Sequence, residues 1–463
     1  MAIKVALIYP RFAYPSGDFS IGLASIGASL RKHIAGIELS LIDSTFHPGL
    51  SHVRGRLAAE RPDIAAIYSD TLMFEDAVKV ARACKELGAL VIVGGPHPTI
   101  LPELTLAVDA IDAVGIGEGE ETAREFVECV SEGKNLDSVR GIWFKRDGKV
   151  VKNPPRPTAQ DLDALPFPAV DLYETERYIK AFVQLDSYLP NLRGMSLVAS
   201  RGCPFQCGYC QPTLTRLFGS KLRIRSTKSV VEEILLLRDR YALDAFYFQD
   251  DTLTVFRDWI RDFCSRMIQE RVGMVWACNT RADTCDDELF SLMRRAGCVK
   301  IKVGIESVTD RIRNGIYRKN ISMGQVDALT RSASGAGIQV AGFFMLGAPT
   351  ETIEEMNDTI RYAVASGLVE ANFSIATALP LTDLWETARQ MGWNLPDHFR
   401  SYDYYKATRP SLAHDDVSRR TLDRLRRKAV LQFYLHPKRI GKLLSSLSSR
   451  TGVTRLRMKL KRF

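Results

Sequence analysis

The first third of the chain alternates short apolar runs with stretches in which apolar residues recur at helical spacing. The apolar runs predict buried strands of the parallel type at residues 3–9, 38–43, 64–68, 89–93 and 113–116. The amphipathic stretches predict helices at residues 22–33, 52–60, 75–87 and 121–130. Strand and helix follow each other about every fifteen to twenty residues, and this alternation predicts a doubly wound parallel sheet.

A second series of the same kind begins at Met195. Its apolar runs predict strands at residues 196–199, 245–249, 274–279, 300–304, 339–346 and 372–376. The helices predicted between them cover residues 229–240, 259–269, 287–296, 323–336 and 354–366. After Leu381 the alternation stops, and one further helix is predicted at residues 417–434. The pattern therefore predicts two successive α/β domains.

Proline marks the boundary between the two series. Residues 141–190 contain the proline-rich runs 153–157 and 165–168, and Asp147-Gly148 predicts a short hairpin within residues 143–151. Such composition is typical of a linker. We therefore expect a first domain at residues 1–140, a linker at 141–190, a second domain at 191–400 and a helical C-terminal segment at 401–463.

The net charge of +9 is concentrated at one end of the chain. Residues 436–463 contain basic residues and no acidic residue, and they carry the whole excess, since the rest of the chain is neutral. A neutral body gives no reason to expect nucleic-acid binding. The basic tail, with leucines interleaved, is either a solvated tail or a segment that contacts the anionic surface of a membrane, and the second alternative would favour a lipid or isoprenoid substrate. The basic residues of the tail are Lys438, Arg439, Lys442, Arg450, Arg455, Arg457, Lys459, Lys461 and Arg462.

The start of the chain and its cysteines indicate the compartment. Residues 1–9 predict a first strand, not a signal peptide, and the longest uncharged apolar stretch, near residues 340–349, is broken by glycines and predicts a buried strand. The nine cysteines show no pairing pattern for a disulfide framework. We therefore expect a protein of the reducing cytoplasm, associated with the inner face of the membrane if the tail binds there.

Ligands of a doubly wound sheet bind at the carboxyl ends of its strands. Glycines there allow a large flat ligand to approach the backbone closely. No G-x-G-x-x-G opens a helix after the first strand, so a dinucleotide is a weak interpretation. The candidate cofactor-binding residues at these ends are Ser69, Thr71, Gly94, Gly95, Gly117, Glu118 and Gly119.

Three cysteines lie close together at the start of the second series. Cys203, Cys207 and Cys210 have the spacing C-x3-C-x2-C, and Gly202, Pro204 and Gly208 predict a loop. Three thiolates can hold a cubane of four irons and leave one iron free for another ligand, much as a catalytic zinc keeps an open position. A structural zinc loop, or three unrelated buried thiols, are the alternatives.

The cysteine loop, with an aromatic residue before its third cysteine, resembles the signature of the radical SAM superfamily. Further phrases resemble the cobalamin-binding radical SAM enzymes, which include C-methyltransferases and the anaerobic magnesium-protoporphyrin cyclase: Gly-Gly-Pro-His-Pro-Thr, Gly-Glu-Gly-Glu, Gln-Asp-Asp-Thr, Gly-Ile-Glu-Ser and Phe-Met-Leu-Gly-Ala-Pro-Thr-Glu. The resemblance covers roughly residues 1–400. Two departures are His47, four residues after Asp43 where cobalamin mutases have D-x-H, and Ala348-Pro-Thr where the group often has Phe-Pro-Gly.

The resemblance implies a Rossmann-like cobalamin-binding domain, then a partial (β/α)6 TIM-like radical SAM barrel and a helical basic C-terminal segment. It implies a 4Fe–4S cluster on Cys203, Cys207 and Cys210, with SAM on the free iron and cobalamin on the first domain. Polar groups at successive strand ends suit the amine, carboxylate and ribose of SAM, and aromatic side chains can shield the cluster or adenine. The implied SAM-binding residues are Phe205, Tyr209, Gln249, Asp250, Asp251, Arg281, Glu306, Ser307 and Gly347.

The activity implied by the resemblance is radical methylation of an unactivated carbon. A 5′-deoxyadenosyl radical from SAM removes a hydrogen atom, and the substrate radical takes a methyl group from methylcobalamin. The expected partners are a small-molecule substrate and a flavodoxin- or ferredoxin-type electron donor. A radical SAM cyclase, ring-forming or C–C coupling enzyme is the first alternative, and a non-enzymatic metal-binding module is the second.

Overall fold

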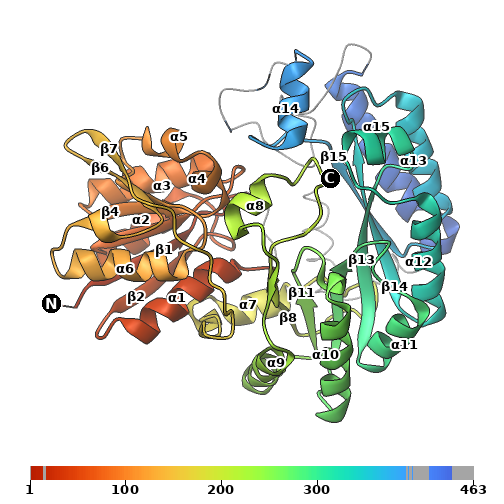
Figure 1. Cartoon of the computed structure of the whole chain (residues 1–463), viewed down its shortest axis with the longest axis horizontal. Coiled ribbons are helices and arrows are strands. Elements are labelled where there is room, and N and C mark those ends of the chain that lie inside the picture. The colour runs from red at the N-terminus through yellow and green to blue at the C-terminus, as the bar shows by residue number, and fades with distance from the viewer. Residues whose placement is uncertain (1, 14–16, 393–394, 396–398, 400–416, 441–463) are drawn as a thin grey trace. The chain divides into compact units, whose positions relative to one another are not determined.

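The structure is a computed structural model that describes residues 2–13, 17–392, 395, 399 and 417–440 (Figure 1). Contacts between residues divide the chain into two compact units. The first unit comprises residues 1–175 and 213–223, and the second comprises residues 176–212 and 224–463. The chain therefore passes from one unit to the other after residues 175, 212 and 223.

A seven-stranded sheet is the centre of the first unit, with the order β2-β1-β3-β4-β5-β6-β7. The first five strands of this order are parallel, and β6 and β7 continue the sheet antiparallel. All five predicted strands are present. The strands are β1 (Lys4–Tyr9), β2 (Glu38–Asp43), β3 (Ile64–Tyr68), β4 (Leu90–Gly94), β5 (Ala113–Gly115), β6 (Ile142–Arg146) and β7 (Lys149–Lys152).

Helices connect these strands and complete the core of the first unit. α1 packs with α6 and α2 packs with α3, and the apolar residues of the central strands are fully buried. The order 2-1-3-4-5 places the topological switch point between β1 and β3, where such sheets bind ligands. The helices are α1 (Ile21–His33), α2 (Leu50–Glu60), α3 (Phe74–Glu86), α4 (Pro96–Ile100), α5 (Pro102–Leu106) and α6 (Glu120–Ser131).

The hairpin predicted within residues 143–151 is present as β6 and β7. Asp147 and Gly148 form its turn with φ of 50° and 74°, the left-handed backbone that a two-residue hairpin requires. The sequence pattern did not predict that the hairpin joins the sheet. It does so because β6 pairs with β5, so that residues 141–175 pack within the first unit.

Six parallel strands in sequential order form an open half-barrel in the second unit. The helices between them lie along the outer side of the sheet, as Figure 1 shows for α12 and α13. The strands are β8 (Gly194–Leu197), β11 (Ala245–Phe248), β12 (Val275–Thr280), β13 (Cys298–Glu306), β14 (Gln339–Leu346) and β15 (Glu370–Ile375). The helices are α9 (Thr227–Tyr241), α10 (Arg257–Gln269), α11 (Asp287–Arg295), α12 (Met323–Gly335) and α13 (Ile353–Ala365).

Shorter elements fill the remaining parts of the described chain. Phe182 and Leu185 pack against Ala245, Tyr247 and Ala277 of the half-barrel and are almost fully buried. The helix predicted at residues 417–434 is observed as α15, which packs on β15 and α13. These elements are α7 (Thr175–Lys180), β9 (Ser200–Arg201), α8 (Thr213–Phe218), β10 (Arg223–Ile224), α14 (Asp383–Gln390), α15 (Arg419–Tyr434) and the helical turns at residues 136–138, 170–172, 253–255 and 311–316.

One basic residue of the predicted tail belongs to the folded body. Arg439 is 7% exposed, and its guanidinium donates to the carbonyl oxygens of Val364, Ser366 and Leu368 at 2.7–3.1 Å. Arg439 therefore holds the C-terminal end of α13 and is not available to a membrane. The other predictions for residues 401–416 and 441–463 lie outside the described residues. No helix in the described part of the chain is long and apolar enough to cross a membrane.

Candidate active site

A buried carboxylate holds the start of the cysteine loop. Asp250, which follows β11, accepts hydrogen bonds from the backbone N–H of Ala199 at 3.1 Å and from the backbone and hydroxyl of Ser200. Burial raises the pKa of Asp250, and these hydrogen bonds act in the opposite direction by favouring the charged form. The loop then turns at Gly202, whose φ of 95° favours glycine.

The other end of the loop is held by backbone hydrogen bonds. Gly208 donates from its N–H to the carbonyl oxygen of Tyr317 at 2.9 Å and accepts from the N–H of Leu384 at 2.9 Å. A Cβ atom at position 208 would lie 3.2 Å from the carbonyl oxygen of Ile316. Gly208 is therefore needed for this close approach, and the loop is fixed at both ends.

All three cysteines of the loop are free thiols. Cys207 is buried, and Cys203 and Cys210 are half-buried. Burial raises the pKa of Cys203 and of Cys210, and the nearby Cys207 raises both further. Among the described residues, no three His, Cys, Asp or Glu side chains already converge to hold a metal ion. A bound cation would reverse the pKa shift of the cysteines by stabilising their thiolates.

The donor set fits the predicted iron–sulfur cluster. Three thiols on one short loop, fixed at both ends, supply three corners of a cubane, and one iron remains for SAM. Cysteine sulfur is the ligand type that iron–sulfur clusters require. Cys203, Cys207 and Cys210 would hold the cluster, and the bound cluster would supply the electron that cleaves SAM.

Lys319 joins the loop to the end of β13, and sequence reasoning missed it. Its ammonium donates to Tyr209 Oη and to Glu306 Oε1, both at 2.9 Å, and Tyr209 donates to the same Glu306 oxygen at 2.9 Å. Although burial lowers it, the net pKa of Lys319 is raised, because Glu306 and Cys207 stabilise the ammonium. Gly304 leaves room for this contact, since a Cβ there would overlap both charged groups. The signal available in the sequence was the position of Lys319 on the segment that follows the Gly-Ile-Glu-Ser phrase.

Arg281 contacts the cysteine loop through an aromatic ring. Its guanidinium carbon lies 4.0 Å from the centre of the Phe205 ring. It also donates to Asp283 Oδ1 at 2.8 Å and to the carbonyl oxygen of Asn320 at 2.9 Å. The structure therefore brings Arg281 to the cluster loop, and its predicted contact with the SAM carboxylate stays a prediction.

The remaining predicted SAM contacts lie at the ends of β11, β13 and β14. Desolvation and the neighbouring Asp250 raise the pKa of Asp251 to about 6, and Gln249 is half-buried beside it. Ser307 is fully buried, with its hydroxyl 3.3 Å from that of Thr359. Gly347 has a φ of 86°, and a Cβ there would lie 2.8 Å from Leu422, so packing against α15 also requires glycine.

The predicted cobalamin edge of the first unit has open space and unpaired hydroxyls. A Cβ on Gly94 would have no heavy atom within 4 Å, whereas Gly95, with a φ of 108°, packs on the carbonyl oxygen of Ser69. The hydroxyls of Ser44 and Thr45, just after β2, are buried and make no hydrogen bond. These residues fit a large ligand with many polar groups. When bound, cobalamin would supply a methyl carrier at this edge.

Other predicted residues at this edge bond within the first unit. The hydroxyl of Thr71 lies 3.3 Å from Nδ1 of His97, a fully buried histidine whose pKa burial lowers to about 3. The N–H of Gly117 donates to Thr99 Oγ1 at 3.0 Å, and Gly119 packs closely on Ile26. Glu118 forms an ion pair with Arg223, at 2.8 Å and 3.0 Å, so its carboxylate is already engaged.

The side chain of His47 is engaged by a carboxylate of the first unit. Its Nε2 atom is 2.8 Å from Glu174 Oε1, and its side chain is 40% exposed. The histidine is therefore held at the surface by a carboxylate, which agrees with the departure from the mutase motif noted in the sequence.

Comparisons with known proteins identify the family. A profile of the radical SAM superfamily matches residues 197–363, and a profile of the B12-binding domain matches residues 19–127. The chain is 34% identical over 380 residues to an uncharacterized methyltransferase from Pyrococcus horikoshii, a match that covers 81% of this chain and 80% of the relative. The chain belongs to the cobalamin-binding radical SAM family.

Two further relatives of this radical SAM enzyme have named activities. It is 33% identical over 450 residues to cytidylyl-2-hydroxyethylphosphonate methyltransferase from Streptomyces wedmorensis, covering 85% of this chain and 83% of the relative. It is 28% identical over 385 residues to an anaerobic magnesium-protoporphyrin IX monomethyl ester cyclase from Rubrivivax gelatinosus, covering 81% of this chain and 66% of the relative.

A solved structure confirms the fold of this radical SAM enzyme. The radical S-adenosylmethionine methyltransferase TsrM from Kitasatospora setae, with cobalamin and a [4Fe-4S] cluster bound, superposes with a TM-score of 0.70 at 18% identity. The match covers 85% of this chain and 76% of TsrM. The predicted family, fold class and cofactors are therefore confirmed: a 4Fe–4S cluster, SAM and cobalamin.

Removal of one cluster ligand tests the loop. We expect Cys207→Ala to lose nearly all cluster iron and all 5′-deoxyadenosine formation, because two thiolates cannot hold a cubane with a free iron. Iron analysis of anaerobically reconstituted protein and chromatography of SAM products measure both. The matched control is Cys129→Ala, which removes a free thiol from α6 in the first unit and should keep both values. Full iron and turnover in Cys207→Ala would contradict the assignment.

The pH dependence of stability tests the end of β14. Glu351 accepts from the N–H groups of Gly347 and Ala348 at 2.7 Å and 2.9 Å, and burial raises its pKa to about 7. The folded state therefore keeps the Glu351 proton up to about pH 7, whereas the unfolded state releases it above the lower, ordinary pKa of a glutamate. The free energy of unfolding is highest at acidic pH and falls as the pH rises through 7, by about 3 kcal/mol in all.

We expect the melting temperature of wild type to fall from pH 5.5 to 8.5 relative to that of Glu351→Gln, measured by circular dichroism. The control is Glu386→Gln on α14: the pKa of Glu386 is lowered, because hydrogen bonds from Arg389 and Gln390 stabilise its charge. Glu386 is thus ionised in both states over this range, so its variant should follow wild type. A constant difference between wild type and Glu351→Gln would contradict the shifted pKa.

Proposed function

We propose that this radical SAM enzyme is a C-methyltransferase that acts on an unactivated carbon of a small molecule. One observation supports this proposal most directly: the same chain contains a loop of three thiols that is held at both ends and suits a SAM-binding cluster, and a sheet edge that fits cobalamin. The bound cluster and SAM supply a radical, and cobalamin supplies the methyl carrier. The relatives from Pyrococcus horikoshii and Streptomyces wedmorensis, at 34% and 33% identity, are both named methyltransferases, which supports this proposal.

The residues of the second unit then have distinct proposed roles. Cys203, Cys207 and Cys210 hold the cluster, and Asp251 accepts from the amine of SAM. Lys319 keeps Tyr209 and Glu306 in place beside the loop through the hydrogen bonds described above. The further proposed SAM contacts are Phe205, Gln249, Asp250, Arg281, Ser307 and Gly347, within a core domain of residues 191–400.

In the first unit we propose that residues 1–140 hold cobalamin, and that residues 141–190, of which 141–175 pack within this unit, form the connection to the second unit. Gly94 leaves open space at the sheet edge, and the hydroxyls of Ser44 and Thr45 can bond to amide groups of the corrin. The other proposed cobalamin contacts are Ser69, Thr71, Gly95, Gly117, Glu118 and Gly119. The methyl group would reach the substrate from this edge.

A cyclase is the second candidate, and the relative from Rubrivivax gelatinosus favours it. The products of SAM separate the two. Methyl transfer from SAM leaves S-adenosylhomocysteine, whereas cyclisation without methyl transfer consumes SAM only as 5′-deoxyadenosine. The share of each product therefore reports the reaction class without knowledge of the substrate.

The test uses holoenzyme with hydroxocobalamin, reduced by titanium(III) citrate in the presence of SAM labelled with deuterium in its methyl group. We expect both unlabelled S-adenosylhomocysteine and 5′-deoxyadenosine, quantified by mass spectrometry. 5′-Deoxyadenosine alone would favour the cyclase. Neither product, from protein with full iron content, would show a non-enzymatic metal-binding module and overturn the proposal. The Cys207→Ala variant is the blank.

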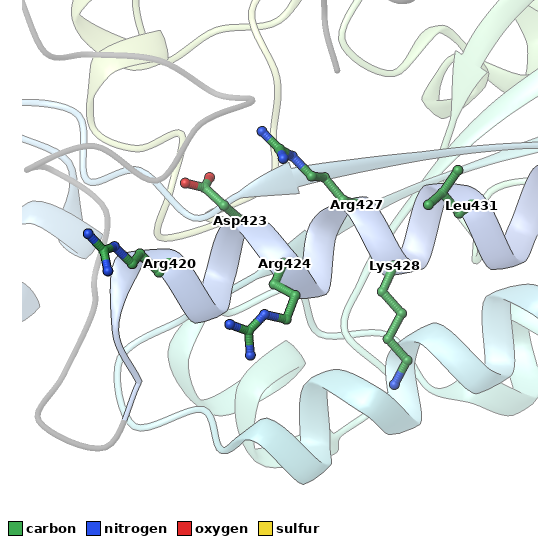
Figure 2. A pocket seen from close by; sticks show the side chains of 6 residues that line it. All are labelled: Arg420, Asp423, Arg424, Arg427, Lys428 and Leu431. Carbon is green, nitrogen blue, oxygen red and sulfur yellow. The ribbon is translucent and has the colours of Figure 1, made fainter.

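We further propose that the C-terminal segment contacts an anionic lipid surface, such as the cytoplasmic leaflet, and that a lipid or isoprenoid is the substrate. Exposed cationic side chains of α15 line a groove of about 470 Å³. Figure 2 shows Arg427 extending from one edge of the helix and Arg424 and Lys428 from the other. Each basic residue near anionic lipid contributes about 1 kcal/mol, so the effects add. The groove residues are Arg420, Asp423, Arg424, Arg427, Lys428 and Leu431.

Sedimentation with vesicles tests this contact. We expect the full chain to bind vesicles that contain phosphatidylserine, and a chain ending at residue 440 to bind several-fold less, because seven basic residues of the tail are then absent. This end point keeps Arg439, which holds α13. Vesicles of phosphatidylcholine alone are the control. Equal partitioning of both chains on the anionic vesicles would contradict the membrane contact.

A further inference from the structure

Residues 213–223 leave the second unit directly after the cysteine loop and pack within the first. In this segment, α8 contacts α4, which follows the Gly94-Gly95 edge. The carbonyl oxygen of Leu217 lies 3.7 Å from the position of a Cβ on Gly117. The segment therefore packs against the same loops of the first unit that are proposed to hold cobalamin.

A buried ion pair fixes this segment. The two η-nitrogens of Arg223 donate to the two carboxylate oxygens of Glu118 at 3.0 Å and 2.8 Å, and the side chains are only 6% and 7% exposed. The same nitrogens donate to the carbonyl oxygens of Ala159 at 2.6 Å and Phe218 at 2.8 Å. Glu118 also accepts from the N–H of Ala159 at 2.8 Å. The pair thus joins three separate stretches of the first unit.

Such a pair is costly to bury, and good geometry with further hydrogen bonds offsets part of this cost. Both η-nitrogens of Arg223 are satisfied in this way, and its Nε atom is buried without a hydrogen bond. A bidentate arginine–carboxylate pair also specifies one orientation, which a single charge contact does not. Removal of one partner would leave the other charge buried. The pair therefore holds Arg223 in one place relative to the Gly117–Gly119 loop.

Both ends of the segment return to the cysteine loop. Two residues, Gln211 and Pro212, separate it from Cys210, and the carbonyl oxygen of Gln211 accepts from the N–H of Asp383 at 3.0 Å in the second unit. At the other end, the N–H of Arg225 donates to the carbonyl oxygen of Ala199 at 2.9 Å. Ala199 is the residue whose own N–H is bound by Asp250 at the start of the loop.

We propose that the Glu118–Arg223 ion pair makes residues 213–223 a tether that couples the cobalamin-binding unit to the cluster-bearing loop. Arg223 is then a positioning residue for the methyl transfer between SAM and cobalt, and it takes no part in SAM cleavage. This inference rests on the methyltransferase function proposed above. In the transfer, the S–CH3 bond of SAM breaks, its electron pair stays on sulfur, and the electron pair of reduced cobalt forms the new bond to the methyl group.

The test compares wild type with Arg223→Met as full-length holoenzyme, in a single turnover with SAM, hydroxocobalamin and titanium(III) citrate, without added substrate. We expect the ratio of S-adenosylhomocysteine to 5′-deoxyadenosine to fall about tenfold or more, because methyl transfer needs alignment of two cofactors and SAM cleavage does not. Iron content and the cobalamin spectrum should stay at wild-type values.

A second readout does not depend on activity. Hydrogen exchange followed by mass spectrometry should show the amides of residues 213–223 exchanging about tenfold faster in Arg223→Met, with the rest of the first unit unchanged. The matched control is Arg156→Met, which breaks the half-buried pair of Arg156 with Glu125 in the same unit and does not touch the segment. It should keep the wild-type product ratio and the wild-type exchange of residues 213–223.

The outcomes separate the claims. An unchanged product ratio in Arg223→Met, or an equal fall in Arg156→Met, overturns the tether. Wild-type protein that forms no S-adenosylhomocysteine overturns the proposed function itself. If Arg223→Met does not fold, Glu118→Gln and Arg223→Lys carry the test. Glu118→Gln should lower the product ratio as well. Arg223→Lys keeps the positive charge but loses the contact through two nitrogens, so its product ratio should lie between those of wild type and Glu118→Gln.

Discussion

The bond between the Asp250 carboxylate and the start of the cysteine loop is the interaction on which the site depends. It joins the end of β11 to Ala199 and Ser200, so the loop leaves the half-barrel in one direction. At its other end the loop is held by Gly208 on the carbonyl oxygen of Tyr317. A cluster with three protein ligands needs such fixed ends, because a mobile loop could not keep one iron open while excluding a fourth ligand.

In the first unit, too, the loops that follow parallel strands form the proposed site. Its parallel strands bring Gly94, Gly117 and the hydroxyls of Ser44 and Thr45 to one edge, and helices cover the apolar faces. The chain does not simply follow one unit with the other, since residues 213–223 return to the first unit between two parts of the second. The covalent chain therefore joins the two units at three points, after residues 175, 212 and 223.

Local periodicity made most of the fold predictable from the sequence. Every strand of both parallel sheets and the Cys203–Cys210 loop were predicted, because apolar runs, glycines and cysteine spacing are short-range signals. Contacts between residues that are distant in the sequence were not predicted. The ion pair of Glu118 with Arg223 was not predicted, and Lys319 was missed, because contacts between residues far apart in the sequence leave no periodic signal. The contact of Arg281 with the Phe205 ring was not predicted for the same reason, because cation–π partners follow no rule of sequence spacing.

The most direct test of the account is the optical and electron paramagnetic resonance spectrum of the full chain, purified without oxygen from cells supplied with cobalamin. The account predicts one 4Fe–4S cluster and one corrinoid per chain, with the cluster signal changing when SAM is added, because SAM binds the open iron. A protein with full corrinoid whose cluster signal does not respond to SAM, or one that contains zinc in place of iron, would contradict it.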